Sequence, residues 1–446
     1  MHPLIYDWNR TTETPRPSVM LDDETLRDGL QSPSVRCPSI DEKLRILHLM
    51  DGLGIDTADL GLPGAGPHVV RDVERLAREI VDGRLRIQAN CAARTVIADI
   101  KPIVEVSQRV GLPIECGTFI GSSPLRQYAE GWSLDQLLKL TEDAIAFAVG
   151  ENLPVMYVTE DTTRADPDTL RALYSTAIRA GAKRVCIADT VGHATPAGAA
   201  AVVRFVATIV EECGGGIGID WHGHRDRDLA IANTIAALDA GATRLHGAAI
   251  GIGERVGNTP MDALLVNLVL MGYIERDLSA LCEYCEAVSA ATGVPIPPNY
   301  PIAGRDAFRT ATGVHAAAVI KAFRKKDAGL IDAVYSGVPA SLVAREQQID
   351  VGPMSGKSNV VFWLERRGIA ASDALVDRIF AKAKGSATVL TEQKAEGRRQ
   401  KAEGRRQKAE GRRQKASYCG RPAGRSPRRS AGQGVKPRMW PGTTRN

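Results

Sequence analysis

The sequence alternates regularly between short apolar segments and longer amphipathic ones, and this rhythm constrains the fold more than any other feature. Eight apolar segments with the character of strands begin near residues 19, 57, 86, 113, 154, 184, 218 and 243. Eight amphipathic segments alternate with them, at residues 39–53, 67–81, 95–110, 133–149, 166–180, 196–213, 226–240 and 260–271. Near-continuous apolar strands are typical of parallel sheets that are covered on both faces. Eight strand–helix pairs in about 255 residues therefore predict a (β/α)8 TIM barrel.

The ends of the amphipathic segments support their assignment as helices. Several begin at Ser, Thr, Asp or Pro, which are common at helix N-termini. Two end directly before a glycine, at Ala180 and Ala240. The alternative fold is a doubly wound open sheet. That fold would require a glycine-rich phosphate turn after the first strand, and the dipeptide Asp28-Gly29 is not such a turn.

The alternation of strand-like and helix-like segments ends after about Gly272. Residues 275–292 predict a helix, the proline-rich segment VPIPPNYP predicts a linker, and two more helices are predicted at residues 308–323 and near residues 373–383. We expect four parts in the chain. They are an N-terminal arm (1–17), a barrel domain (18–274), a small, mostly helical subdomain (275–385) and a disordered basic tail (386–446).

The tail differs in composition from everything before it. From Gln393 the heptapeptide QKAEGRR occurs three times, with a helix-weakening glycine and no large apolar residue in each copy, which argues against a coiled coil. Residues 393–446 carry 17 Lys+Arg and three Glu, a net charge of +14, whereas the whole chain carries +5. Residues 1–392 therefore form an acidic body with a net charge of −9. We expect the tail to be disordered and to bind nucleic acid only non-specifically, through its charge.

The remaining composition indicates a cytoplasmic protein. No apolar run is long enough to span a bilayer, and the first residues, MHPLIYDWNR, lack the basic and apolar regions of a signal peptide. The eight cysteines are scattered, which favours reduced thiols over a disulfide framework. Cys282 and Cys285 form a CxxC sequence on a predicted helix, but no second pair accompanies it, so we expect no zinc or redox site there.

Candidate functional residues lie at the ends of predicted strands. The first strand leads into LDDETLRDG, which places Arg27 and Asp28 at its carboxyl end. The seventh ends in HGH, and because residues i and i+2 of a strand point to the same face, His222 and His224 can reach one ion. The eighth is followed by GIGERVGN, which ends in Asn258. Strands one, seven and eight are neighbours in a closed barrel, so we expect a Mg²⁺, Mn²⁺ or Zn²⁺ site at its C-terminal mouth.

These segments, LRDG, then HGH with Asp226, then GIGERVGN, resemble the metal-dependent acetyl-CoA:2-oxoacid condensing enzymes of the DRE-TIM family. That family includes 2-isopropylmalate, homocitrate and citramalate synthases, and hydroxymethylglutaryl-CoA lyase is a relative. The resemblance extends from about Val19 to Ala383. It implies that Asp28, His222, His224 and Asn258 bind the metal. It also implies that Arg27 is catalytic and binds the oxoacid oxygens.

The same resemblance assigns four further residues. The segment TEDTTR points to Glu160 as a catalytic acid, and ADTVGHATP points to Thr190 as a hydroxyl donor to the substrate carboxylate. GVHAAAVIK, beyond the barrel, points to His315 as a catalytic histidine, and Tyr335 matches a tyrosine after it. Taken without the resemblance, each has a plainer interpretation: a loop cap for Glu160, a turn residue for Thr190, and surface or packing residues for His315 and Tyr335.

Some positions depart from the family pattern. Arg225 replaces the Asn of the usual HxHND, Asp228 stands where Gly is common, and Leu30 stands where synthases usually carry Glu and the lyases carry Leu. The glycine- and cysteine-rich loop of the lyases is absent and the post-barrel histidine segment is present, and both favour a synthase. The identity of the oxoacid stays open. A 2-oxoglutarate pocket would need an extra cation. Arg94 or Arg126, near strand ends, could supply it; the alternative is that both are plain surface arginines.

We therefore expect an acyltransferase that condenses acetyl-CoA with a 2-oxoacid. We favour 2-oxoisovalerate, which would give 2-isopropylmalate and a role in leucine biosynthesis. The alternatives are a homocitrate or citramalate synthase, a carbon–carbon lyase of the HMG-CoA lyase type, and a non-catalytic binding subunit. His315, assisted by Tyr335, is the expected base toward the acetyl-CoA methyl group, with Glu160 orienting or sharing the proton. We expect the subdomain that carries His315 to pack against a partner barrel in a homodimer.

Overall fold

The structure is a computed structural model that describes residues 2–9 and 18–390. Eight parallel strands close into one barrel in chain order, with β8 paired to β1. The strands are β1 (Met20–Asp23), β2 (Thr57–Asp59), β3 (Gln88–Arg94), β4 (Glu115–Gly121), β5 (Val155–Glu160), β6 (Arg184–Asp189), β7 (Gly218–Gly223) and β8 (Arg244–Gly247). The predicted (β/α)8 TIM barrel is confirmed. The doubly wound alternative is wrong, because an open sheet has two edge strands and the closed ring has none.

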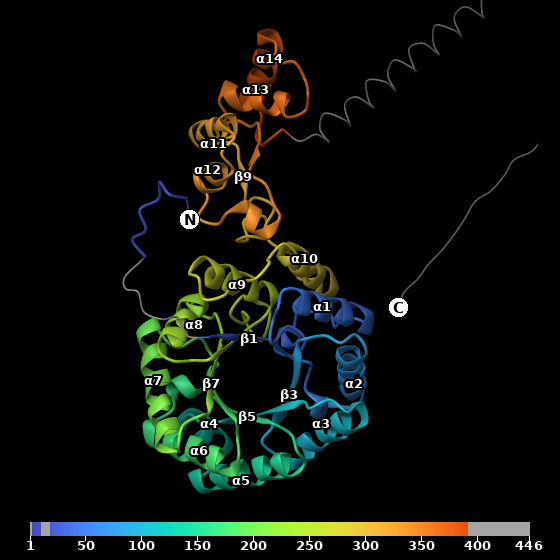
Figure 1. Cartoon of the computed structure of the whole chain (residues 1–446), viewed down its shortest axis with the longest axis vertical. Coiled ribbons are helices and arrows are strands. Elements are labelled where there is room, and N and C mark those ends of the chain that lie inside the picture. The colour runs from blue at the N-terminus through green and yellow to red at the C-terminus, as the bar shows by residue number, and fades with distance from the viewer. Residues whose placement is uncertain (1, 10–17, 391–446) are drawn as a thin grey trace, which may run out of the picture. The chain divides into compact units, whose positions relative to one another are not determined.

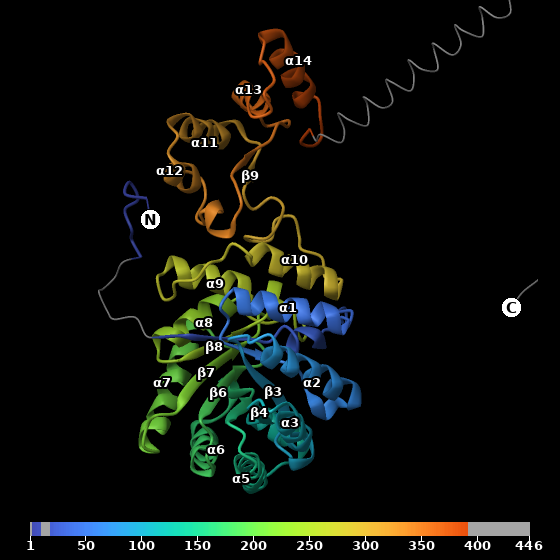
Figure 2. The same ribbon diagram turned by 45° about the vertical axis from the view of Figure 1, so that its right-hand side comes forward.

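Helices follow the strands and lie outside the ring (Figures 1 and 2). They are α1 (Ile40–Gly52), α2 (Pro67–Asp82), α3 (Ile97–Val110), α5 (Leu134–Gly150), α6 (Pro167–Ala180), α7 (Pro196–Glu212), α8 (Ala230–Asp239) and α9 (Met261–Leu270). One short additional helix, α4 (Pro124–Glu130), separates β4 from α5 and was not predicted. The predicted tail beyond residue 390 lies outside the described residues.

The helix boundaries follow from side-chain capping. Ser39 and Ser133 each form a capping box with the residue three positions on, at the starts of α1 and α5. Gly181, with φ 112°, ends α6 in a left-handed conformation that only glycine adopts readily. Helix α8 begins at Ala230 rather than at the predicted residue 226. The chain first makes a turn there, in which the Asp228 amide donates to the Arg225 carbonyl at 2.8 Å.

The chain beyond the barrel is built from short elements. They are α10 (Leu281–Thr292), β9 (Arg309–Thr310), α11 (Gly313–Lys325), α12 (Ala328–Ala333), β10 (Gln348–Ile349), α13 (Lys357–Glu365) and α14 (Asp373–Lys384). Tyr284 on α10 is fully buried, and its hydroxyl contacts Thr25 and Asp23 at the end of β1, which ties this helix to the barrel. Helix α11 begins five residues later than predicted, because Arg309 and Thr310 pair with β10 instead.

Two groups of apolar side chains are buried separately. The larger group lies between the barrel strands and their helices and includes Trp221 and Tyr157, both fully buried. The smaller group joins α11, β10 and α13 through Ala316, Val319, Ile320, Ile349 and Phe362. Within residues 2–9 and 18–390, no helix combines the length and the apolar character needed to cross a membrane. All seven cysteines in these ranges are free thiols.

Candidate functional site

The carboxyl ends of the barrel strands surround a cavity of ≈ 320 Å³. The polar side chains that line it come from segments far apart in the sequence: the end of β1 and the residues after it, the ends of β2 and β5, the first residue after β6, and β7 and β8 with the residues that follow them. In barrels of this type the active site lies at this same end of the strands. Six of the predicted site residues line this cavity: Arg27, Asp28, Glu160, Thr190, His222 and His224.

The two predicted histidines, His222 at the end of β7 and His224 directly after it, meet the carboxylate of Asp28, which follows β1. The Nε2 atoms of His222 and His224 lie 3.3 Å apart, and each lies 3.7 Å from Oδ2 of Asp28. All three side chains are buried. Two imidazole nitrogens and one carboxylate oxygen that converge in this way form a donor set suited to a divalent cation.

Asn258, the fourth predicted ligand, lies beside this set. Its backbone forms an isolated bridge with His224, and its Nδ2 donates to Oδ1 of Asp28 at 2.9 Å. Its side-chain oxygen Oδ1 is buried and has no hydrogen-bond partner. This buried amide oxygen lies next to two imidazoles and a carboxylate, and a bound cation would give it the partner that it lacks. These residues therefore fit a divalent metal.

The glycine-rich sequence before Asn258 makes this approach sterically feasible. Gly253 has φ 144°, and a Cβ atom at this position would lie 2.2 Å from Nδ2 of Asn258 and 2.7 Å from Oδ1 of Asp28. Any larger residue would therefore push apart the two side chains that meet there. The backbone amide of Glu254 also donates to Oδ1 of Asp28, at 3.1 Å, which fixes the carboxylate from the second side.

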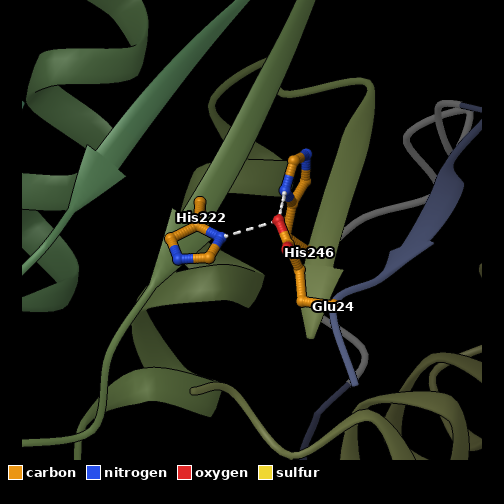
Figure 3. Close-up of side chains that lie close together, drawn as sticks. All are labelled: Glu24, His222 and His246. Atoms are coloured by element: carbon orange, nitrogen blue, oxygen red, sulfur yellow. Dashed lines mark hydrogen bonds and ion pairs between the residues drawn. The ribbon is translucent and has the colours of Figure 1, made fainter. Parts of the chain in front are cut away.

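A second group of buried polar side chains adjoins the first through His222 (Figure 3). Oε1 of Glu24 lies 3.3 Å from Nδ1 of His222 and 3.0 Å from Nδ1 of His246. Nε2 of His246 lies 3.3 Å from Oδ2 of Asp220, at the inner end of the same network. Glu24, His222 and His246 also satisfy the distances of a three-ligand metal group.

Arg27 links the acidic residues at the mouth of the barrel. Its guanidinium contacts three carboxylates: Nε lies 3.1 Å from Asp59, one terminal nitrogen lies 3.1 Å from Asp28, and the other lies 2.5 Å from Glu24. The side chain keeps 16% of its surface exposed, toward the cavity. Arg27 therefore places a fixed positive charge next to the group of Asp28 and the two histidines.

Burial and the surrounding charges set the protonation of these groups. Burial lowers the pKa of His224 to about 4, against the pull of Asp28, so its imidazole is neutral at pH 7 and able to act as a ligand. Burial works to raise the pKa of Asp28, but Arg27 and the histidines outweigh it and hold the pKa at about 2. Burial likewise opposes ionisation of Glu24, yet Arg27, His222 and His246 hold its pKa well below the usual range.

Glu160, the last residue of β5, and Thr190, the first residue after β6, also line the cavity. Oε1 of Glu160 is 2.9 Å from Nε of Arg126, and burial raises the pKa of this carboxyl above its ordinary value despite that partner. The Thr190 hydroxyl oxygen accepts a hydrogen bond from the backbone amide of Asp161 at 2.8 Å, which leaves its proton available to a ligand.

His315 and Tyr335 do not line this cavity. Their rings stack on each other, with centroids 4.3 Å apart and planes inclined by 30°. His315 is exposed on the first turn of α11, and Tyr335 is 49% exposed. The structure therefore brings these two residues together, but it does not bring them to the other predicted site residues of the same chain.

The rest of the cavity wall is apolar. Strands β3 to β6 and the segment after β2 contribute Leu62, Ala92, Phe119, Met156, Val158 and Ala188. Neither Arg94 nor Arg126 lines the cavity: Arg94 pairs with Asp99 at 2.7 Å, and Arg126 pairs with Glu160 and Glu130. The two arginines that do line it, Arg27 and Arg255, are each already paired with carboxylates.

The sequence interpretation missed Glu24, Asp59, His246 and Arg255. For His246 a signal was present, because a histidine in the middle of the strand segment TRLHGAA must either point into the barrel or be buried at a cost in free energy. Arg255 belongs to the motif GIGERVGN, but no pattern in the sequence singled it out. The structure shows that its Nε lies 2.9 Å from Oδ1 of Asp226, which follows the HGH segment.

Known proteins resemble this chain in sequence and in fold. Residues 18–288 match the HMGL-like family. A probable 2-isopropylmalate synthase of Methanopyrus kandleri is 31% identical over 370 residues, which cover 82% of this chain and 69% of that protein. Homocitrate synthase AksA of the same organism is 33% identical over 385 residues, which cover 85% of this chain and 91% of that protein.

Solved structures give the same barrel. The HMG-CoA lyase of Bacillus subtilis superimposes with a TM-score of 0.53 at 20% identity, over 64% of this chain and 97% of that one. At this identity the likeness bears on the fold alone. The match to the family covers more than half of the chain, and the two synthases are each more than 30% identical over most of it, so the chain belongs to the HMGL-like family.

Proposed function

We propose that the chain is an acyltransferase that condenses acetyl-CoA with a 2-oxoacid, and that 2-oxoisovalerate is the oxoacid, giving 2-isopropylmalate. The observation that carries the proposal is the meeting of Asp28, His222 and His224 beside Arg27, in a cavity whose far wall is apolar. The similarity to a probable 2-isopropylmalate synthase and to homocitrate synthases supports the reaction class.

Asp28, His222, His224 and Asn258 would hold a divalent metal. When bound, such an ion supplies Lewis acidity toward the ketone of the oxoacid. Asn258 would contribute its Oδ1, which is buried and unpartnered. Magnesium, manganese and zinc all accept this mixture of imidazole and oxygen ligands.

Arg27 and Thr190 would orient the oxoacid. Arg27 presents a guanidinium that three carboxylates hold in one position, so it can donate to the ketone oxygen as negative charge develops there. The Thr190 hydroxyl would donate to the substrate carboxylate, since its oxygen already accepts from Asp161. Glu160, whose pKa is raised by burial, would orient a water molecule or share the proton during hydrolysis of the thioester.

His315 and Tyr335 would act on a second copy of the chain. Both are exposed, and neither lines the cavity of its own barrel, so they are available to a neighbouring barrel mouth. In that position His315, supported by the stacked Tyr335, would remove a proton from the methyl group of acetyl-CoA. The carbon so formed attacks the ketone, and hydrolysis of the thioester releases CoA. This arrangement requires a homodimer.

The walls of the cavity favour an apolar oxoacid side chain. A second carboxylate, as in 2-oxoglutarate, would face Phe119, Val158 and Ala188 without an unpaired cation to receive it. Burying an unpaired carboxylate there would cost several kcal/mol. Homocitrate synthesis is therefore the weaker candidate, although the relatives include homocitrate synthases.

The test is CoA release by the purified full-length chain with acetyl-CoA and Mg²⁺ or Mn²⁺. The oxoacids to compare are 2-oxoisovalerate, pyruvate, 2-oxoglutarate and oxaloacetate. We expect release with 2-oxoisovalerate to exceed release with the others. Release only with 2-oxoglutarate would overturn the choice of substrate. If none of the four oxoacids gives CoA release and the chain instead cleaves a hydroxyacyl-CoA, the proposed synthase activity would be replaced by a lyase activity.

A further inference from the structure

We infer that Glu24 is a positioning residue that orients His222 on one side and Arg27 on the other, and that His246 holds Glu24 in place. The inference rests on the metal site proposed above and adds two residues to it. Neither residue belongs to the set that the sequence motifs indicate, and both are buried, with exposed fractions of 2%. Glu24 contacts the cation-binding His222 and the oxoacid-binding Arg27, and His246 contacts Glu24.

The two oxygens of Glu24 perform different tasks. Oε1 faces Nδ1 of His222 at 3.3 Å, and Oε2 lies 2.5 Å from the guanidinium of Arg27. A carboxylate has acceptors on both oxygens, whereas an amide has an acceptor on only one. A single ionised Glu24 can therefore orient both neighbours, and no neutral side chain of the same size can.

The contact with His222 determines which ring nitrogen carries the proton. A carboxylate accepts only, so the tautomer that suits Glu24 has its proton on Nδ1 of His222. Nε2 then presents its lone pair toward His224 and Asp28, where the cation is proposed. Carboxylates behind metal-bound histidines commonly fix the ring in this way, and their loss typically weakens metal binding by about 10–100-fold.

His246 supplies the matching positive charge. Both of its ring nitrogens face carboxylates: Nδ1 lies 3.0 Å from Oε1 of Glu24, and Nε2 lies 3.3 Å from Oδ2 of Asp220. Because carboxylates only accept, both nitrogens are donors and the ring is an imidazolium. Arg244 donates to the same oxygen of Asp220 at 2.7 Å and Arg184 donates to the other oxygen, so Asp220 is held in place and His246 is fixed at both ends.

The same three residues, Glu24, His222 and His246, would otherwise be candidates for a second cation. An imidazolium cannot be a metal ligand, since it has no free lone pair. The geometry around His246 therefore favours an ion-paired support over a second metal, and the number of ions bound per chain separates the two.

The experiment measures Mn²⁺ binding to the full chain by calorimetry, for wild type, Glu24→Gln and His246→Gln. We expect one ion per chain in all three. We expect affinity to fall by about 10–100-fold in Glu24→Gln. His246→Gln should weaken binding less, and it should add little in the Glu24→Gln background, because it acts through Glu24. Glu24→Asp, which restores the charge, should recover part of the affinity.

The matched control is Glu115→Gln. Glu115 is also a barrel carboxylate, paired with Arg244 at 2.5 Å, but it contacts no proposed ligand. It should lower thermal stability without changing Mn²⁺ affinity. Wild-type affinity in folded Glu24→Gln and Glu24→Asp would overturn the inference, as would two ions per chain with one lost in His246→Gln. Absence of Mn²⁺ binding in wild type would overturn it together with the metal site. Tight Mn²⁺ binding without CoA release would overturn only the proposed reaction.

Discussion

His222 and His224 direct their Nε2 atoms at one another across 3.3 Å, and a carboxylate oxygen of Asp28 lies 3.7 Å from both. Two imidazole lone pairs at this distance repel each other unless a proton or a cation lies between them. Burial lowers the pKa of His224 to about 4, so at pH 7 this ring is neutral and can offer a lone pair to a cation.

Replacing His224 by Ala should abolish metal binding and turnover. The change removes one of two nitrogen donors, so we expect Mn²⁺ affinity to fall by more than about 100-fold, beyond the loss expected for a supporting residue. Calorimetry and CoA release measure the two effects. His48→Ala is the control, because His48 is an exposed histidine that pairs with Glu79 on the outside of the barrel. An active, metal-free His224→Ala would contradict the proposed site.

Replacing Gly253 by Ala should separate Asp28 from Asn258. Its Cβ would lie 2.2 Å from the Asn258 amide, so one of the two side chains must move. We expect weaker Mn²⁺ binding as well as backbone strain. Gly241→Ala is the matched control, because Gly241 also has a positive φ, 118°, but its Cβ would meet nothing within 4 Å. Equal Mn²⁺ affinity in the two variants would show that the close approach of Gly253 is not needed.

The barrel was predictable because its signal is local and repeated. Ser39, Ser133 and Gly181 each mark a helix end through their own side chain or backbone, so the boundaries could be read without tertiary contacts. Boundaries failed where long-range pairing intervened. Residues 309–310 continue an amphipathic pattern, yet they join β10, some 39 positions on, and delay the start of α11.

The site was predictable only where its residues belong to contiguous motifs. His222 and His224 are two positions apart at the end of β7, and Arg27 and Asp28 are adjacent in sequence, so local spacing was enough. Glu24 and His246 are 222 positions apart and meet only because β1 and β8 close the barrel, with Asp22 opposite His246 in the register. Which carboxylate supports which histidine depends on that register, and no local pattern contains it.

Stability should fall between about pH 6.5 and pH 10 through His246. Burial disfavours its charge, but Asp22, Asp220 and Glu24 outweigh burial and raise the pKa to about 10, above the unfolded value of about 6.5. The folded state therefore binds more protons in this range, and stability declines as pH rises. Chemical denaturation at pH 6.5, 8 and 9.5 should show that the difference in free energy of unfolding between wild type and His246→Gln becomes smaller as pH rises. A constant difference between the two would contradict this assignment.

Mixed dimers should restore activity that neither parent variant has. If His315 serves the barrel of the partner, a chain with His315→Ala keeps an intact metal site, and a chain with His224→Ala keeps an intact His315. Joining one of each creates one complete site. Random exchange would give activity near about a quarter of the wild-type level per chain, because half of the dimers are mixed and each has one working site.

The control for this exchange is a mixture in which both chains carry His315→Ala, which should stay inactive. Restored activity would support a site shared between subunits. It would also explain why the rings of His315 and Tyr335 stack at an exposed position away from the cavity of their own chain. Full activity of His315→Ala alone would remove the histidine from the mechanism. Inactive mixtures of dimers shown to contain both variants would place its action within a single chain, reached by movement of the segment that carries α11.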